Sequence, residues 1–250
     1  MINSKNNTNN TIQAFWISIG SLFAFGFTIV SLMILSRYFP KEDYGTYKQV
    51  IYVYNTLLVV FTLGLLQAFS YFLPRIPLNE AKSLISKITN LFFLLGFIFS
   101  LILFLFSKQI AVILKIPDLD LAIRIFSAVP IFLLPTMGLE GILATFRQTK
   151  FMAIYTVSTK IFMLFCVAIP VIIFNGGYIQ AIIGFVVASF ISFLLAFYLK
   201  FYPVREAKRE KCSITYKEIF IYSLPLLFAS IWGIIISSAD QFFISRYFGS

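Results

Sequence analysis

The chain has 250 residues, of which 60 % are hydrophobic and 12 % are charged, and its net charge is +10. A soluble domain is about 45–50 % apolar and about 25 % charged, so this composition excludes a water-soluble enzyme. Histidine is absent and the two cysteines lack metal-ligand spacing, which disfavours a metal site. No Gly-rich phosphate loop is present. We therefore expect a membrane protein without metal or cofactor.

Seven apolar segments predict transmembrane helices. A helix needs about 20 apolar residues to cross the hydrocarbon core, and the run 91–106 is apolar on every face, unlike a barrel strand. The predicted helices cover residues 13–35, 50–73, 88–106, 121–143, 152–174, 178–199 and 219 onward. The fold class is an all-α integral membrane protein. Residues 1–12 are expected to form a disordered tail and residues 200–218 a basic loop.

Basic residues gather on the side of the N-terminus. That side carries twelve lysines and arginines: Lys5, Arg75, Lys82, Lys87, Arg147, Lys150, Lys200, Arg205, Lys208, Arg209, Lys211 and Lys217. The other side carries six: Arg37, Lys41, Lys48, Lys108, Lys115 and Arg246. The positive-inside rule places the N-terminus in the cytoplasm, with anionic lipid headgroups as neighbours rather than nucleic acid.

The first and seventh predicted helices resemble each other. The tetrapeptide Ser-Arg-Tyr-Phe at 36–39 recurs at 245–248, an offset of 209 residues. The same offset pairs small or polar residues on one helical face: Ser21 with Ser230, Ala24 with Gly233, Thr28 with Ser237, and Ser31 with Asp240. This stripe indicates either close helix packing or the wall of a central cavity to which Ser21, Thr28 and Ser237 would contribute. Residues 13–199 are then one six-helix bundle and 219–250 begin a second, so we expect a fragment of a chain about twice as long.

Three segments resemble polysaccharide flippases of the Wzx type, in the multidrug, oligosaccharidyl-lipid and polysaccharide exporter superfamily. They are 35–47 (LSRYFPKEDYGTY), 63–74 (LGLLQAFSYFLP) and the Ser-Leu-Pro start at 223–225, followed by Asp240 and Arg246. The resemblance implies two six-helix bundles in the bacterial inner membrane. It also implies alternating access that moves an undecaprenyl-pyrophosphate-linked oligosaccharide outward for surface polysaccharide synthesis, together with other polysaccharide assembly proteins.

Charges within the predicted spans are the candidate substrate contacts, because ionisable residues in a bilayer are costly. Lys160 lies eight residues into the fifth predicted helix, on a polar face with Tyr155, Thr156 and Thr159. A cation there could hold the pyrophosphate, whereas the alternative is a lysine that extends to the inner surface. Arg124, at the outer start of the fourth helix, is a further candidate.

Other charges suggest gating pairs. Glu140 and Arg147 are seven residues apart, on one face of a continuous helix at the inner end of the fourth span, and could form an ion pair, a gate or a solvated interfacial pair. Asp240 could pair with Arg37 or Arg246 to close the outer side. Pro130 and Pro135 interrupt the same fourth helix and predict a kink, either as a bending point or as a fixed packing feature.

The sequence alone also allows functions other than that of a flippase. An ion-coupled antiporter of the multidrug type would be expected to bury carboxylates, but the first, second, third, fifth and sixth predicted helices contain none. A membrane-embedded glycan enzyme is disfavoured by short loops and missing histidines. The sequence is also compatible with a scaffold protein or a channel subunit.

Overall fold

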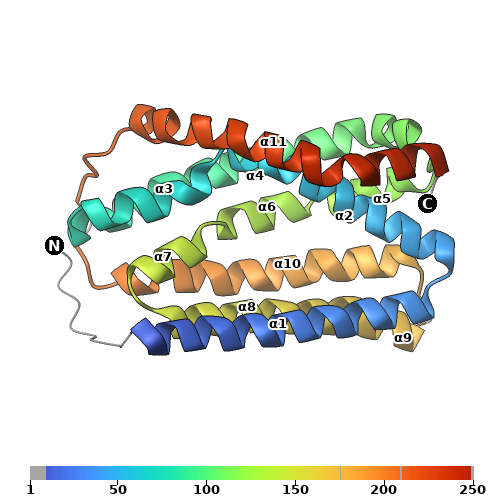
Figure 1. The fold of residues 1–250 in the computed structure, drawn as a ribbon, viewed down its shortest axis with the longest axis horizontal. Helices are drawn as coiled ribbons and strands as arrows, with labels where there is room; N and C mark the ends of the chain where they lie inside the picture. The colour runs from blue at the N-terminus through green and yellow to red at the C-terminus, as the bar shows by residue number, and fades with distance from the viewer. Residues whose placement is uncertain (1–9, 175, 209, 249–250) are drawn as a thin grey trace.

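Long helices run side by side along the long axis of the molecule (Figure 1). The structure is a computed structural model that describes residues 10–174, 176–208 and 210–248; the side chain of Phe174, and those beyond Gly233 except Ile236 and Phe243, lie outside this description. The described residues are 87 % helical and contain no β-strand. The predicted all-α class is confirmed.

The helices follow one another in an up-and-down order. In chain order they are α1 (Asn10–Tyr38), α2 (Lys41–Thr62), α3 (Leu65–Phe72), η1 (Leu73–Arg75), α4 (Leu78–Leu114), α5 (Leu119–Phe126), α6 (Val129–Leu133), η2 (Leu134–Thr136), α7 (Leu139–Thr145), α8 (Thr149–Met163), η3 (Leu164–Ala168), α9 (Ile169–Phe174), α10 (Tyr178–Phe201), η4 (Tyr202–Val204) and α11 (Tyr216–Phe248). Within the described residues, five helical stretches are long and apolar enough to cross a membrane, and α2 with α3–η1, bent by 46°, makes a sixth.

The helix boundaries extend beyond the apolar segments. The second span begins at Lys41 rather than at residue 50, so Gly45 lies within the helix. Pro40 precedes this helix in an extended conformation. Glu42 and Asp43 occupy its first turn, where their carboxylates interact favourably with the positive end of the helix dipole. Because these signals are polar, an apolar-run criterion misses the first nine residues.

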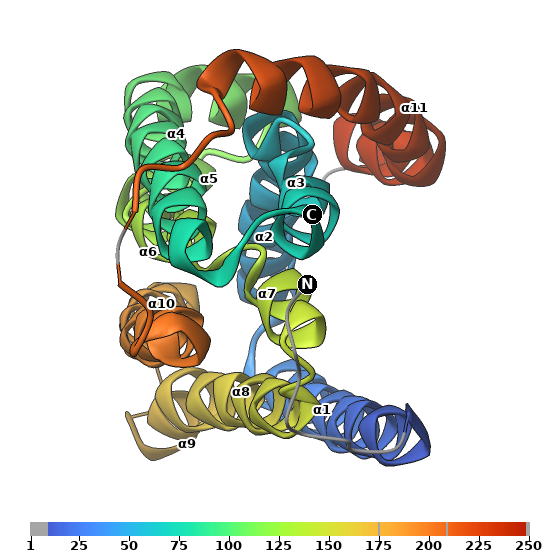
Figure 2. The ribbon, with the colours of Figure 1, turned by 90° about the vertical axis from the view of Figure 1, so that its left-hand side faces the viewer.

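The small-residue stripe of α1 packs against α8, and the end-on view shows the two helices together (Figure 2). Gly20 and Ala24 are buried, and a Cβ atom on Gly20 would lie 2.8 Å from the Cβ of Ala153. Ser21 on the same helix is exposed, while the Thr28 hydroxyl donates to the carbonyl of Ala24 at 2.8 Å. Of the predicted stripe, the burial of Ala24 fits close packing, and Gly20, which was not part of the stripe, makes the close approach to α8.

The predicted basic loop is bound to the start of α4. Glu80 accepts hydrogen bonds from the backbone N–H and hydroxyl of Ser213, each at 2.6 Å, and Lys87 donates to the carbonyl of Ile214 at 2.7 Å. Cys212, just before these anchored residues, is buried, and burial raises the pKa of its thiol. Both cysteines are free, with Cys166 half-buried in η3.

Lys200 corrects the sequence-based loop assignment. It belongs to the last turn of α10 and its side chain is 0 % exposed, although it was counted among the loop charges. An apolar run ending at residue 199 cannot reveal that the helix continues into a protein-lined site. The loop keeps its other basic residues, so the charge excess on the side of the N-terminus remains.

Candidate functional site

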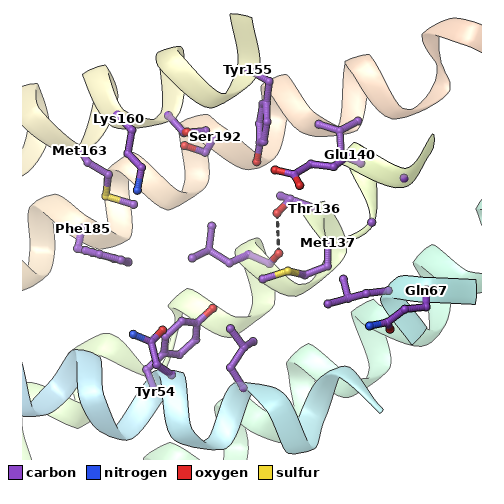
Figure 3. A pocket seen from close by; sticks show the side chains of 18 of the residues that line it. Tyr54, Gln67, Thr136, Met137, Glu140, Tyr155, Lys160, Met163, Phe185 and Ser192 are labelled. Atoms are coloured by element: carbon purple, nitrogen blue, oxygen red, sulfur yellow. Dashed lines mark hydrogen bonds between the residues drawn. The ribbon is translucent and has the colours of Figure 1, made fainter. Parts of the chain in front are cut away.

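A cavity of about 610 Å³ lies between four parts of the bundle (Figure 3). Its volume is within the range of about 300–1,000 Å³ that is usual for ligand sites. The α2–α3 pair forms one wall, the η2–α7 segment a second, and α8 and α10 the others. The lining residues include Tyr54, Asn55, Gln67, Ser70, Thr136, Met137, Gly138, Glu140, Gly141, Tyr155, Thr159, Lys160, Met163, Phe185 and Ser192.

The η2–α7 wall exists because the fourth span is broken. The helix ends at Thr136, Met137 turns into an extended conformation with ψ 148°, and Gly138 takes φ +76° before α7 begins. Pro135 supplies no backbone N–H and favours such an interruption. The break lies where Pro130 and Pro135 predicted a kink, and it places Thr136, Met137 and Gly138 on the cavity.

Lys160 points into the cavity from α8 (Figure 3). Because α8 begins at Thr149, Lys160 lies eleven residues into it, or about 16 Å at 1.5 Å per residue. In the described part of the chain, no hydrogen bond or ion pair joins Lys160 to another residue. It is the only cation among the described residues that line this cavity.

Glu140 and Tyr155 lie together on another part of the cavity wall. Figure 3 shows the Tyr155 hydroxyl directed towards the side chains of Thr136 and Glu140. The Thr136 hydroxyl itself donates to the carbonyl of Leu133 at 2.7 Å. Glu140 makes no ion pair with a described residue, so the cavity holds one carboxylate and one ammonium that do not neutralise each other by contact.

Two buried hydroxyls in the cavity lack a partner among the described residues. They are Oη of Tyr54 and Oγ of Ser192. The Tyr54 ring is held rigidly, because it stacks on Phe99 with 5.6 Å between ring centroids and packs edge-on against Phe126. A buried hydroxyl without a hydrogen bond is costly, so these two groups are available to a polar ligand or to water.

The remaining polar lining is neutral. Asn55 and Gln67 contribute side-chain amides and Ser70 a hydroxyl, and all three are exposed to the cavity and its mouth. Amides and hydroxyls donate and accept, as the hydroxyl groups of a sugar require. With the Tyr54 and Tyr155 rings beside them, the cavity is suited to a neutral polar group that is attached to an anion.

The structure gathers only part of the predicted site. Lys160, Thr159, Tyr155 and Glu140 line the cavity, whereas Thr156 does not and donates to the carbonyl of Met152 at 2.9 Å. Substrate contact by these residues stays a prediction.

The other candidates lie elsewhere. Arg124 pairs with Asp120 at 2.9 Å and reaches Ser107 at 3.2 Å, in the opposite end of the bundle from the N-terminus. Ser21, Thr28 and Arg37 on α1 are absent from the described cavity lining. The side chains of Ser237, Asp240 and Arg246 lie outside the described residues.

The expected Glu140–Arg147 arrangement needs correction. The helix ends at Thr145, and Arg147 sits exposed in the following turn with φ +56°. The two side chains therefore do not share the face of a continuous helix, and they form no ion pair in the structure.

A comparison with known protein families shows the family to which this chain belongs. The family model described as "Polysaccharide biosynthesis protein" matches residues 12–250. The chain belongs to this family. Family membership and the membrane-type helical bundle together support a transport protein for polysaccharide synthesis, and the resemblance noted from the three sequence segments is confirmed. No curated protein and no solved structure matches the chain significantly.

Sequence reasoning missed several cavity residues of this polysaccharide biosynthesis protein. Tyr54 and Asn55 are adjacent polar residues within an apolar span, a signal that was available but was not used. Ser189 and Ser192 are two serines within a long apolar run, and nothing in that run distinguishes Ser192 as a cavity residue. Gln67 and Ser70 lie after the bend between α2 and α3, and only that bend brings them to the cavity.

Proposed function

We propose that this protein is a flippase that moves an oligosaccharide linked to undecaprenyl pyrophosphate from the inner to the outer leaflet of the bacterial inner membrane. The observation that carries the proposal is Lys160, an ammonium group that forms no hydrogen bond or ion pair with a described residue and points into a cavity lined in part by hydroxyls and amides. Family membership supports the link to polysaccharide synthesis.

In the proposed mechanism the cavity binds the polar head of the substrate. Lys160 binds the pyrophosphate through charge-assisted hydrogen bonds, which are about twice as strong as neutral ones. The Tyr54 and Ser192 hydroxyls and the Gln67 amide then bind the first sugars, while the lipid tail stays in the bilayer. Residues 13–199 act as the first bundle and α11 begins the second, and alternating motion of the two bundles opens the cavity to each side in turn.

A transport assay tests this proposal. The full-length protein, in vesicles that contain a fluorescent undecaprenyl-pyrophosphate oligosaccharide, should make nearly all of the label accessible to an impermeant quencher. Protein-free vesicles should keep about half of it protected, because the two leaflets of a vesicle hold similar amounts of lipid. Equal protection with and without the protein would refute flipping.

Glu140 supports one alternative, a proton-coupled antiporter, because it places a carboxylate on the cavity wall. Such an antiporter would expel a cationic dye from vesicles when a pH gradient is applied, and Glu140→Gln would abolish that expulsion. A flippase should expel no dye under the same conditions.

The orientation is part of the proposal and has its own prediction. With Cys166 and Cys212 replaced, a cysteine at the exposed position Glu42 should react with an impermeant maleimide in intact cells, and one at Lys208 should react only after permeabilisation. Glu42 is a better choice than Asp43, because Asp43 accepts a hydrogen bond from the N–H of Tyr178 at 3.3 Å. The reverse labelling pattern would overturn a cytoplasmic N-terminus.

A further inference from the structure

Lys200 is a fully buried lysine that is not among the described residues that line the cavity. Its Nζ donates to the carbonyl of Pro135 at 2.8 Å and to that of Met137 at 2.9 Å. The same atom lies 4.9 Å from the centroid of the Phe69 ring and 5.8 Å from that of Phe92. No carboxylate within the described residues forms an ion pair with it. Two carbonyl dipoles and two aromatic faces therefore stabilise its charge.

Lys200 donates hydrogen bonds to backbone carbonyls that lose their intrahelical donors at the helix break. A break exposes carbonyls that would otherwise accept hydrogen bonds from the next turn, and in a bilayer these must be satisfied within the protein. The carbonyl of Leu133 accepts from the Thr136 hydroxyl, and that of Leu134 from the N–H of Met137. Lys200 supplies the donors for Pro135 and Met137. A cation at this position also interacts favourably with the negative, C-terminal end of the helix dipole of α6–η2.

The segment that Lys200 holds is one wall of the cavity. Thr136, Met137 and Gly138 line it directly, and α7, which follows, brings Glu140 and Gly141 to it. Phe69 packs against both Lys200 and Gly138, so α3, α7 and α10 meet at this point. A change in the break would move Glu140 and Gly141 relative to α3.

We infer that Lys200 is a positioning residue for transport, a clamp on α10 that fixes the break in the fourth span and thereby the shape of the cavity wall. The inference rests on the proposed function for its role in transport. The clamp itself rests only on the two hydrogen bonds and on the burial of the side chain. Lys200 does not line the cavity and is not a substrate ligand.

A disulfide between α3 and α7 measures the position of the wall without any substrate. A Cβ atom on Gly141 would lie 2.7 Å from Oγ of Ser70, so cysteines at these two positions should cross-link on mild oxidation of the full-length protein that lacks Cys166 and Cys212. Lys200→Met keeps most of the side-chain volume but removes the donors and the charge. We expect it to slow cross-linking at least fivefold.

Two further variants keep the test decisive. Lys217→Met changes an exposed lysine near the same end of the bundle and should leave the cross-linking rate unchanged. Lys200→Gln keeps two N–H donors on a shorter neutral side chain and should give an intermediate rate, which decides the question if the Met variant does not accumulate. Wild-type rates in folded Lys200→Met and Lys200→Gln proteins would overturn the clamp.

The cross-linking experiment tests the clamp, and the transport assay tests the proposed flippase, so each can fail without the other. Slower cross-linking in a protein that moves no lipid-linked oligosaccharide supports the clamp and refutes the flippase. Unchanged cross-linking in an active flippase refutes the clamp alone.

Discussion

Replacing Lys160 with Ala should abolish complementation of surface polysaccharide in a strain that lacks its own flippase, while the amount of protein in the membrane stays normal. The side chain points into the cavity and makes no hydrogen bond or ion pair with a described residue, so its removal breaks no contact that supports the fold. A hydrogen bond to a charged group contributes about 1.5–3 kcal/mol, which corresponds to roughly 10- to 100-fold weaker substrate binding.

Matched variants make the Lys160 result interpretable. Lys41→Ala removes an exposed lysine at the start of α2, outside the described cavity lining, and should complement fully. Lys160→Arg retains a cation and should recover part of the activity, because the charge matters more than the exact donor geometry for a flexible pyrophosphate. Full complementation by Lys160→Ala at normal protein levels would remove Lys160 from the site.

Gly138→Ala should lower the thermal stability of the purified protein and prevent complementation. Gly138 has φ +76°, a conformation that costs other residues about 1–2 kcal/mol, and an added Cβ atom would overlap the ring of Phe69. Phe69 is itself fully buried and packs near Lys200, so it cannot move aside freely. The combined cost should reach about 2 kcal/mol or more, which a thermal unfolding curve in detergent can measure.

Gly26→Ala is the matched control for Gly138→Ala. Gly26 lies within α1, and a Cβ atom there would have no neighbour within 4 Å. Because Gly in a helix is less stable than Ala by roughly 0.5–1 kcal/mol, this variant should be neutral or slightly more stable. Equal melting temperatures for Gly138→Ala and Gly26→Ala would show that the break does not depend on glycine.

Some residues of the candidate site can be predicted from their spacing along one helix, and others can be found only from the way distant segments pack. Lys160, Thr159 and Tyr155 follow one another at helical spacing on a single uninterrupted helix, so the sequence alone predicts that they share a face. Glu140 and Arg147 were assigned to one face by the same reasoning, and this failed because the helix that carries Glu140 ends at Thr145, before Arg147. Helical spacing predicts neighbours only while the helix continues.

The unpartnered hydroxyls of Tyr54 and Ser192 could not be predicted in this way. They belong to α2 and α10, and they reach the same cavity only because those helices pack on either side of it. Ser21 and Thr28 show the converse. They were predicted to share a stripe with Ala24, but Ser21 is exposed and neither Ser21 nor Thr28 is in the described cavity lining.

The sequence by itself determined that this is a bundle of membrane-spanning helices, because the length of an apolar run is set by the thickness of the bilayer and is a local property. It also predicted that Tyr155, Thr159 and Lys160 lie on one face of α8, although it wrongly added Thr156, and three of its segments carry the resemblance to the family. Only the tertiary structure decided the place of Lys200. Its side chain is buried because carbonyls more than 60 residues earlier in the chain are left open by a helix break. Contacts between distant segments depend on how the helices pack, which no local pattern encodes.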